Sequence, residues 1–320
     1  MPAERDLLPG SFAAGMIGYY TGGGKTVRKA ALIYNPKSGG QASGRMLPQV
    51  LALLQGSGFD VEAWPTGGPG DATRLGRRAV EQGGIEVVFV MGGDGTVRET
   101  AAGILGSEIA LGVLPAGTAN VLSLALGLPP DVRRAAKAMK DAAVSEIDVG
   151  RIEGDPFLMM ASGGIDAAVM AHQQAALKKH FGRAAMATAA CIEWWCYPCP
   201  QIALRIDGHN EERASFFAVC NIPFYGGRLR LAPAADCRDG LLDLVLFHGH
   251  GRAAMLGFAR DLMLGRHTRR RDVQMRRVRA VEVLGPAELG IQVDGDVLPL
   301  SPPLRIDLHP HRLRVLTPSG

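Results

Sequence analysis

The chain has 320 residues, of which 47% are apolar and 21% are charged. This length corresponds to about two domains of roughly 150 residues each, and the composition excludes disorder as the main state. No stretch of about 18 uncharged apolar residues occurs, so we expect no transmembrane helix. The net charge of +4 is small, but seven arginines fall between positions 266 and 279, so the basic excess is local.

The first 27 residues are interpreted as a disordered or frayed extension of a cytoplasmic protein. Glu4 and Asp6 stand where a secretory signal would carry basic residues, and prolines and glycines interrupt the apolar part. Five cysteines are too few, and odd in number, for a disulfide-stapled secreted scaffold. We therefore expect reduced thiols.

Short apolar runs alternate with amphipathic segments from residue 28 to residue 148. The four predicted strands are 30–34, 59–64, 85–91 and 109–114. Three of them are nearly continuous in apolar residues, as buried parallel strands are. Helical spacing of leucines before Gly56, a cap at Asp71 and a start at Thr96 predict helices between the strands. Residues 28–148 are thus expected to form a doubly wound parallel-sheet domain.

Strand-like segments with Asp-Gly turns dominate beyond residue 148. The predicted hairpins pair 201–207 with 214–220, and 278–284 with 289–300. Two helical stretches are expected, at 167–195 and 253–264. Residues 149–320 are therefore interpreted as a mostly antiparallel β-sandwich domain. The fold class is α/β plus β, with the active site in the cleft between the two domains.

Three polar, glycine-bearing loops follow strand ends of the first domain. Gly92-Gly93-Asp94-Gly95-Thr96 lies between a strand and a helix, where glycines let backbone N–H groups approach phosphate oxygens. Segments 35–39 and 115–120 follow the first and fourth strands on the same edge. Asp94 would repel bare phosphate, so it acts beside a cation or as a proton acceptor. A glycine-rich turn with an aspartate cap is the structural alternative.

Five motifs in order give the chain a resemblance to the diacylglycerol kinase and sphingosine kinase superfamily, in its bacterial lipid kinase branch. The motifs are the three loops together with Asp236-x-x-Asp239-Gly240-Leu241-Leu242-Asp243 and Asp294-Gly295-Asp296. The resemblance covers the chain from about Arg28 to the C-terminus. It implies an ATP- and Mg2+-dependent lipid kinase that phosphorylates a lipid hydroxyl, with diacylglycerol as the default substrate.

The resemblance also implies which residues bind the cofactors. The ATP site would be lined by Asn35, Ser38, Gly39, Thr66, Gly92, Gly93, Asp94, Gly95, Thr96, Gly117, Thr118 and Asn120. Asp236, Asp239 and the carbonyl of Leu241 would hold Mg2+ between the domains. Two carboxylates three residues apart in a turn can present oxygens to a hard cation, although a solvated Asp-Gly turn has the same sequence signature.

By the same resemblance, the proton acceptor falls on the segment 294–296. A lipid hydroxyl is a poor nucleophile, so a carboxylate must accept its proton during the in-line attack on the γ-phosphoryl group. Asp296 is the first candidate, and it stands where relatives usually have Glu, which shortens its reach by one methylene. Asp294 and Asp94 are the other candidates for the base or for a water-mediated metal ligand.

Two further positions depart from the resembled pattern, which often has Asn where this chain has Arg98 and Asp where it has Val121.

Two other functions remain open. An NAD kinase shares the Gly-Gly-Asp-Gly loop and the two-domain plan, but loops 35–39 and 115–120 argue against it. A non-catalytic nucleotide or lipid sensor is kept open by the substituted base position.

The arginine cluster 266–279 predicts attraction to anionic lipid headgroups, on the order of 1 kcal/mol per basic residue near the surface. A solvated face is the alternative. No base-stacking aromatics are interleaved with the arginines, so no nucleic acid partner is expected. We expect a cytoplasmic, transiently membrane-associated protein whose partner is a lipid with a free hydroxyl, and a homodimer is left open.

Of two further short patterns, the first is rejected as a nucleotide site and the second is interpreted as a structural or incidental cysteine pair. Segment 22–26 resembles a P-loop, but Tyr19 stands at the first required glycine and a strand follows. Cys196 and Cys199 have thioredoxin-type spacing, but they end a predicted helix instead of beginning one, so no helix dipole lowers the pKa of the first thiol.

Overall fold

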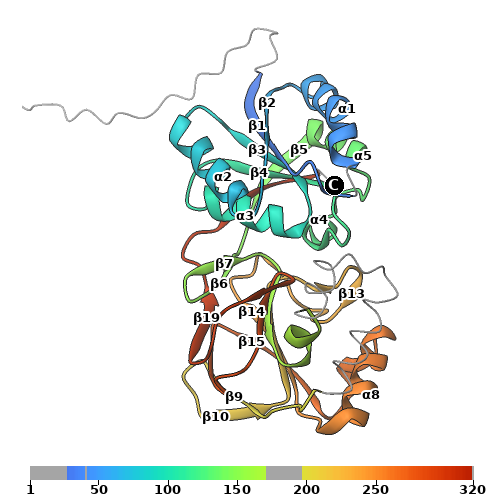
Figure 1. Cartoon of the computed structure of the whole chain (residues 1–320), viewed down its shortest axis with the longest axis vertical. Coiled ribbons are helices and arrows are strands. Elements are labelled where there is room, and N and C mark those ends of the chain that lie inside the picture. Colours follow the sequence, from blue (N-terminus) through green and yellow to red (C-terminus); the bar gives the residue numbers. More distant parts are fainter. Residues whose placement is uncertain (1–26, 40–41, 171–196, 319–320) are drawn as a thin grey trace, which may run out of the picture.

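The computed structural model describes residues 27–39, 42–170 and 197–318. An α/β unit and a β unit lie end to end along the long axis of the molecule (Figure 1). The expected extension lies outside the described residues except for Val27, and so do Cys196 and all but the beginning of the helix expected from residue 167. Within the described ranges, no helix has the length and apolarity needed to cross a membrane.

The first unit is built on a six-stranded sheet with the order β2-β1-β3-β4-β20-β5. Its strands are β1 (Arg28–Tyr34), β2 (Phe59–Pro65), β3 (Val87–Gly92), β4 (Ala110–Pro115), β5 (Ala142–Ile147) and β20 (Leu313–Pro318). The first four pair in parallel, β20 is parallel to β4, and β5 is antiparallel to β20. The four strands predicted from apolar runs are confirmed. Every residue of β3 and β4 is buried, as expected for inner parallel strands.

Five helices of the described part of this unit cover the sheet. They are α1 (Ala42–Gly56), α2 (Asp71–Gln82), α3 (Asp94–Ile104), α4 (Val121–Ala125) and α5 (Val132–Ala138), followed by the short η1 (Met139–Asp141). The chain moves from β1 to β2 in one direction and from β2 through β3 to β4 in the other, so right-handed crossovers place α1 opposite α2 and α3 (Figure 1). The reversal between β1 and β3 is the position where open α/β sheets bind ligands.

The second unit is a sandwich of two six-stranded sheets, with the orders β10-β9-β16-β19-β6-β7 and β15-β14-β11-β8-β17-β18. Strands of the first sheet are β6 (Gly150–Ile152), β7 (Asp155–Phe157), β9 (Ile202–Ile206), β10 (Glu211–Ala214), β16 (Ala280–Gly285) and β19 (Leu304–Leu308). Strands of the second are β8 (Met160–Gly163), β11 (Phe216–Cys220), β14 (Leu242–Phe247), β15 (Val273–Val278), β17 (Ile291–Val293) and β18 (Asp296–Leu298). Side chains from both sheets, such as Phe157 and Phe217, share one buried core. The expected α/β plus antiparallel β architecture is confirmed.

Shorter elements also belong to the part of the β unit that the structure describes. They are the hairpin of β12 (Phe224–Tyr225) and β13 (Leu229–Arg230), the helix α8 (Gly251–Met263) and the turn η2 (His267–Arg269). Helix α8, expected at 253–264, packs Met255, Phe258 and Leu262 against the outer face of the second sheet.

Both predicted hairpins are wrong in their partners. Strand β9 pairs with β10, whereas β11 belongs to the other sheet and pairs with β8 and β14. Likewise β16 pairs with β9 and β19, whereas β17 pairs with β8 and β18. The chain passes between sheets at Ser215 and after β16, and an alternating apolar pattern does not distinguish one inner face from the other.

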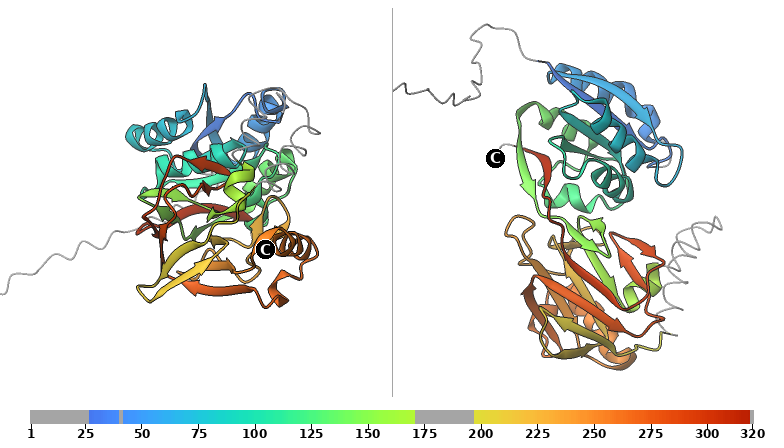
Figure 2. Two further views of the ribbon diagram at one scale, coloured as in Figure 1. Left: turned by 60° about the horizontal axis from the view of Figure 1, so that its bottom comes forward. Right: turned by 90° about the vertical axis from the view of Figure 1, so that its left-hand side faces the viewer.

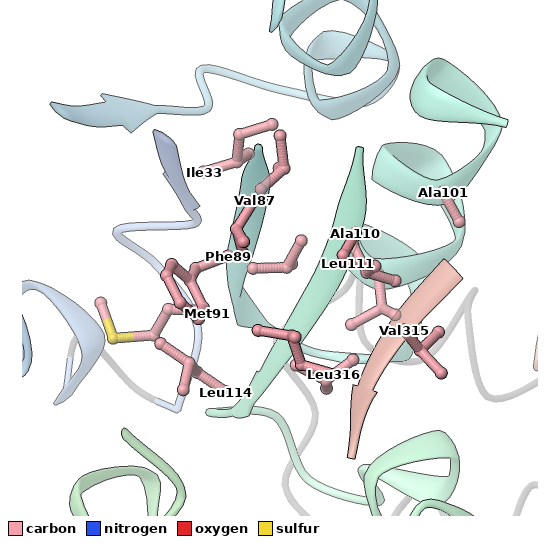
Figure 3. Close-up of a cluster of buried hydrophobic side chains, with 14 of the residues drawn as sticks. Ile33, Val87, Phe89, Met91, Ala101, Ala110, Leu111, Leu114, Val315 and Leu316 are labelled. Carbon is pink, nitrogen blue, oxygen red and sulfur yellow. The ribbon is translucent and has the colours of Figure 1, made fainter. Parts of the chain in front are cut away.

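The C-terminal strand returns to the first unit. After β19 the chain crosses back, and β20 inserts between β4 and β5, where Val315 and Leu316 pack beside Leu111 and Leu114 (Figure 3). Figure 2 shows this red strand beside the green β5. The expected assignment of 149–320 to the second domain is therefore wrong for β20, because its strand pairing lies entirely within the first sheet. Within the described residues, two chain segments therefore join the units.

Candidate active site

The loops that follow β3 and β4 are in direct backbone contact. A Cβ on Gly117 would lie 2.4 Å from the Cα of Gly93, so no side chain fits at position 117. The Asn120 side chain accepts a hydrogen bond from the Gly117 N–H at 2.8 Å and donates one to its carbonyl at 2.9 Å. Three residues from the expected nucleotide set thus fix the shape of two neighbouring loops.

Asp94 begins α3 and ties these loops together from the other side. Its Oδ1 accepts hydrogen bonds from the N–H groups of Val121 at 2.8 Å and Leu122 at 3.4 Å, so it caps α4 and not its own helix. Burial raises the pKa of Asp94 against the opposing effect of these hydrogen bonds. The cap considered as the structural alternative is therefore present, between two loops that the sequence separates.

A cavity of about 610 Å³ lies along the carboxyl edge of the parallel sheet, and we call it the glycine-loop cavity. Of the expected nucleotide set, the residues that line it are Asn35, Thr66, Gly95 and Thr96. Asp296 lines the same cavity from the β unit. The remaining members of the set, Ser38, Gly39, Gly92, Gly93, Asp94, Gly117, Thr118 and Asn120, lie outside its lining.

The loop from 66 to 70, which forms one wall of this cavity, is held by two carboxylates. Asp71 accepts hydrogen bonds from the N–H groups of Gly67 at 2.7 Å and Gly68 at 3.1 Å. Glu99 of α3 accepts one from the Gly70 N–H at 3.0 Å. The expected role of Asp71 as the cap of α2 is wrong, because Gly70 occupies the cap position and Asp71 is the first helical residue.

A second cavity of about 310 Å³ lies between the units, and we call it the methionine cavity. Met159, Met160 and Met170 line it together with the carboxylate-bearing Asp94 and Asp294. Neighbouring residues of the motifs 92–96 and 294–296 therefore face different cavities. Asp94 and Asp294 face the methionine cavity, whereas Gly95 and Asp296 face the glycine-loop cavity.

Asp294 is buried and holds the hairpin between β17 and β18. Its carboxylate accepts hydrogen bonds from three consecutive N–H groups, those of Leu158 at 2.8 Å and of Met159 and Met160 at 2.9 Å. Burial nevertheless raises the pKa of Asp294 to about 6. With φ values of 51° at Asp294 and 89° at Gly295, the backbone turns sharply and projects Asp296 away from the sandwich.

Asp296 forms an ion pair across the interface between the units. Its Oδ2 lies 2.9 Å from Nη2 of Arg98 on α3, and the side chains are 46% and 17% exposed, respectively. These are two of the positions at which the chain departs from the resembled pattern. The two departures are therefore in contact, although 198 residues separate them.

A buried polar network behind the hairpin escaped the sequence analysis. The Gly295 N–H donates to Gln292 at 2.8 Å, Gln292 donates to the Ser162 hydroxyl at 2.9 Å, and Ser162 donates to Asp166 at 2.5 Å. Tyr225 also donates to Asp166, and burial raises the pKa of Asp166. The signal that could have indicated this network is Gly163-Gly164-Ile165-Asp166, which follows a strand just as the first-domain loops do.

The expected metal residues lie apart from both cavities, beside the segments that join the units. Asp148, between β5 and β6, accepts a hydrogen bond from the Gly240 N–H at 2.8 Å. Asp239 Oδ1 accepts one from the Leu241 N–H at 3.1 Å, and its Oδ2 lies 3.6 Å from Nη2 of Arg277. Across the described ranges, no group of three His, Cys, Asp or Glu side chains is arranged to hold a metal.

The donor set nevertheless fits a hard cation. The carboxylates of Asp236 and Asp239, with the carbonyl of Leu241, are oxygen ligands of the kind that Mg2+ prefers. The guanidinium of Arg277 would have to move aside for Asp239 to bind a metal with both oxygens.

Asp294 generates a pH prediction. The folded-state pKa of Asp294, about 6, lies above the value of about 3.9 for an unfolded aspartate, so the folded state binds the proton more tightly. The stabilisation of the folded state by this proton is therefore complete below pH 4 and is lost as the pH rises through 6. We expect the unfolding free energy of the native chain, relative to Asp294→Asn, to fall by about 3 kcal/mol between pH 4 and pH 7. Denaturant titrations at several pH values measure this. If the difference in unfolding free energy between the native chain and Asp294→Asn does not change with pH, the prediction is wrong. Asp60→Asn, on the surface of β2, is the control.

The comparisons with known proteins agree with the two-unit architecture. The diacylglycerol kinase catalytic domain family matches residues 29–152, and the YegS C-terminal NAD kinase beta sandwich-like domain family matches residues 159–317. A solved structure from Bacillus anthracis, named as that of a candidate diacylglycerol kinase, superposes with a TM-score of 0.77 at 25% identity and covers 93% of this chain and 98% of that one.

Relatives of known name match along most of the chain. A diacylglycerol kinase of Mycobacterium tuberculosis is 32% identical over 301 residues, and one of Staphylococcus saprophyticus is 30% identical over 301 residues. In both cases the match covers 91% of this chain and 96% of the relative. A probable lipid kinase YegS-like protein of Chromohalobacter salexigens is 35% identical over 223 residues, covering 67% of this chain and 70% of that protein. The chain therefore belongs to the diacylglycerol kinase family of lipid kinases.

Proposed function

We propose that this protein transfers the γ-phosphoryl group of ATP to a free hydroxyl of a lipid, with diacylglycerol as the default acceptor. The observation that carries the proposal is the pair of cavities that meet at the 294–296 hairpin. One has glycine loops and cationic side chains suited to a triphosphate, and the other has the apolar walls that an acyl-bearing acceptor needs.

Different groups of the protein carry out different parts of the proposed reaction. Backbone N–H groups at the start of α3 and the ammonium of Lys37 bind the phosphates in the glycine-loop cavity. The methionine cavity orients the lipid so that its hydroxyl reaches Asp296. That carboxylate accepts the hydroxyl proton as the oxygen attacks phosphorus. Mg2+ bound with the nucleotide would neutralise part of the charge on the phosphate oxygens.

Asp294 and Asp94 have different roles in this proposal. Each accepts hydrogen bonds from backbone N–H groups, three at Asp294 and two at Asp94, and both sit on the wall of the methionine cavity. Asp296 has one oxygen paired with Arg98 and is half exposed, so it is the carboxylate best placed to take a proton. The structure therefore favours Asp296 as the base and Asp94 and Asp294 as positioning residues.

The test is phosphoryl transfer by purified protein to extracted lipids and defined hydroxyl lipids. We expect labelled phosphate in the lipid fraction. We expect Asp296→Asn to lower kcat at least ~10²-fold without weakening ATP binding, because the lost carboxylate accepts the hydroxyl proton and is not a ligand of the phosphates. Asp155→Asn on β7, an exposed carboxylate outside both cavities, should leave kcat unchanged. Transfer to NAD would instead support the NAD kinase alternative, and ATP binding without transfer to any acceptor would support the sensor.

The proposed inter-domain Mg2+ site has its own test. Asp239→Ala removes a carboxylate ligand, so the Mg2+ concentration needed for half-maximal thermal stabilisation and activity should rise by about 10-fold, in line with the loss of one ligand of a hard cation. Arg277→Ala removes the competing cation and should lower that concentration or leave it unchanged. If Asp239→Ala and the native chain give the same Mg2+ titration, Asp239 is not a metal ligand and the proposed location of the site is wrong.

Membrane contact is proposed through α8 and the arginine cluster. Helix α8 and the residue after it expose Leu256 (56%), Met263 (68%) and Leu264 (57%). Within the cluster, Arg270 pairs with Asp261 and Asp272, which reduces the charge available to lipids. Exposed apolar side chains beside arginines favour adsorption to an anionic surface.

The membrane surface is tested by co-sedimentation with phosphatidylglycerol vesicles. Met263→Asp replaces the most exposed of these apolar side chains with a charge that anionic lipid repels, so the bound fraction should fall at least ~3-fold. Val144→Asp, at an exposed apolar position of β5 in the other unit, is the matched control. Equal binding of both variants would argue against a docking surface on α8.

A further inference from the structure

We propose that Arg98 is a catalytic residue, with one guanidinium that both orients the base Asp296 and binds the phosphoryl group in transfer. This inference rests on the proposed phosphotransfer function and deepens it. The ion pair between Arg98 and Asp296 is the structural starting point, because it joins a helix of the nucleotide unit to the hairpin that carries the base.

The charge inside the glycine-loop cavity leads to the same residue. Among the side chains that line this cavity, Lys37 and Arg98 are the cations, and Glu99 and Asp296 are the anions. Glu99 is engaged by the N–H groups of Gly70 and Ala72. A bound triphosphate would therefore meet its positive charge at Lys37 and Arg98, and Arg98 is the one beside Asp296.

The guanidinium of Arg98 has donors to spare. Nη2 donates to Asp296, whereas Nη1 makes no hydrogen bond to any residue that the structure describes. Nε is buried and also has no partner there. A planar guanidinium can bind two oxygens at once, one on the carboxylate and one on a phosphate, which an ammonium group does less well.

The geometry of the reaction brings the phosphoryl group close to these donors. A hydroxyl whose proton passes to Asp296 lies about 3 Å from that carboxylate, and it attacks phosphorus from about 3 to 3.5 Å. The phosphorus is then within roughly 6.5 Å of a carboxylate oxygen that is itself 2.9 Å from Arg98 Nη2. The same guanidinium can thus contact both groups.

The charge that develops in the step explains what Arg98 would contribute. The lipid oxygen forms a bond to the γ-phosphorus while the bond from that phosphorus to the β,γ-bridging oxygen breaks, the hydroxyl proton goes to Asp296, and ADP leaves. Negative charge is spread over the transferring phosphoryl oxygens, and an arginine in contact with them lowers the barrier. Arg98 acts on those oxygens while it keeps the base in place.

The rival explanation is that Arg98 only joins the two units. A purely structural ion pair would affect ATP and ADP binding equally, because it does not touch the terminal phosphate. The decisive measurement is therefore the affinity for each nucleotide in full-length protein that carries Asp296→Asn, in which turnover is suppressed and the ion pair is already weakened.

In that background we expect Arg98→Gln to weaken ATP binding at least ~10-fold and ADP binding less than ~3-fold, measured by calorimetry, since only ATP offers the contacted phosphate. Arg77→Gln, on the neighbouring helix α2 and outside the glycine-loop cavity, should change neither affinity. Equal losses for ATP and ADP, or no loss, overturn the proposal.

Kinetics with Asp296 intact give the second readout. Arg98→Gln should lower kcat at least ~10²-fold. Arg98→Lys should recover ATP binding more fully than kcat, because lysine restores the positive charge but not the planar guanidinium that binds two oxygens at once. Full recovery of kcat by Arg98→Lys overturns the two-oxygen role. If the native chain transfers no phosphate to lipid while ATP and ADP still differ in their dependence on Arg98, the proposed function fails and the phosphate contact stands.

Discussion

The contact between α3 and the 294–296 hairpin is the constraint on which the candidate site depends. It is the point where a loop from the parallel sheet meets a turn from the sandwich, and the Arg98–Asp296 ion pair lies across it. Each side of the contact is rigid for its own reason. Backbone packing of Gly93 against Gly117 fixes the loop, and three N–H donors to Asp294 fix the turn. Two preorganised surfaces can hold reacting groups in register without either unit moving.

Three aspartates at this contact differ in environment although each is next to a glycine in the sequence. Asp94 and Asp294 each precede a glycine, lie against backbone N–H groups and have a pKa raised by burial. Asp296 is half exposed and pairs with a side chain instead. A carboxylate whose oxygens accept hydrogen bonds from backbone donors stabilises the fold around it, whereas a half-exposed one paired with a single side chain is free to exchange that partner for a substrate.

Membership of the diacylglycerol kinase family fits the division of the interface into a polar and an apolar cavity. A lipid kinase must bring a highly charged phosphoryl donor and an apolar lipid acceptor together at one phosphorus atom. A single pocket cannot be both polar enough for the donor and apolar enough for the acceptor. Here the glycine-loop cavity and the methionine cavity lie on either side of the same hairpin. The buried network from Gly295 through Gln292 to Asp166 supports that hairpin from within the sandwich.

The sequence by itself determined the features that depend on neighbours along the chain. Four parallel strands, the glycine-rich loops among them and the helix at 253–264 follow from apolar periodicity and turn chemistry, and the structure has them. The family resemblance also led to Asp296 and to four lining residues of the glycine-loop cavity, Asn35, Thr66, Gly95 and Thr96. These are local signals, since a strand followed by a glycine turn and a helix places its loop at the carboxyl edge whatever the rest of the chain does.

Only the tertiary structure decided which distant segments meet. The insertion of β20 between β4 and β5, the sheet to which β11 and β17 belong, the capping of α4 by Asp94 and the pairing of Arg98 with Asp296 all join residues far apart in sequence. An apolar strand fits equally well on several buried edges, and a carboxylate can pair with any donor brought near it. The choice is made by packing the whole core, in which one arrangement satisfies the buried backbone and side-chain groups together.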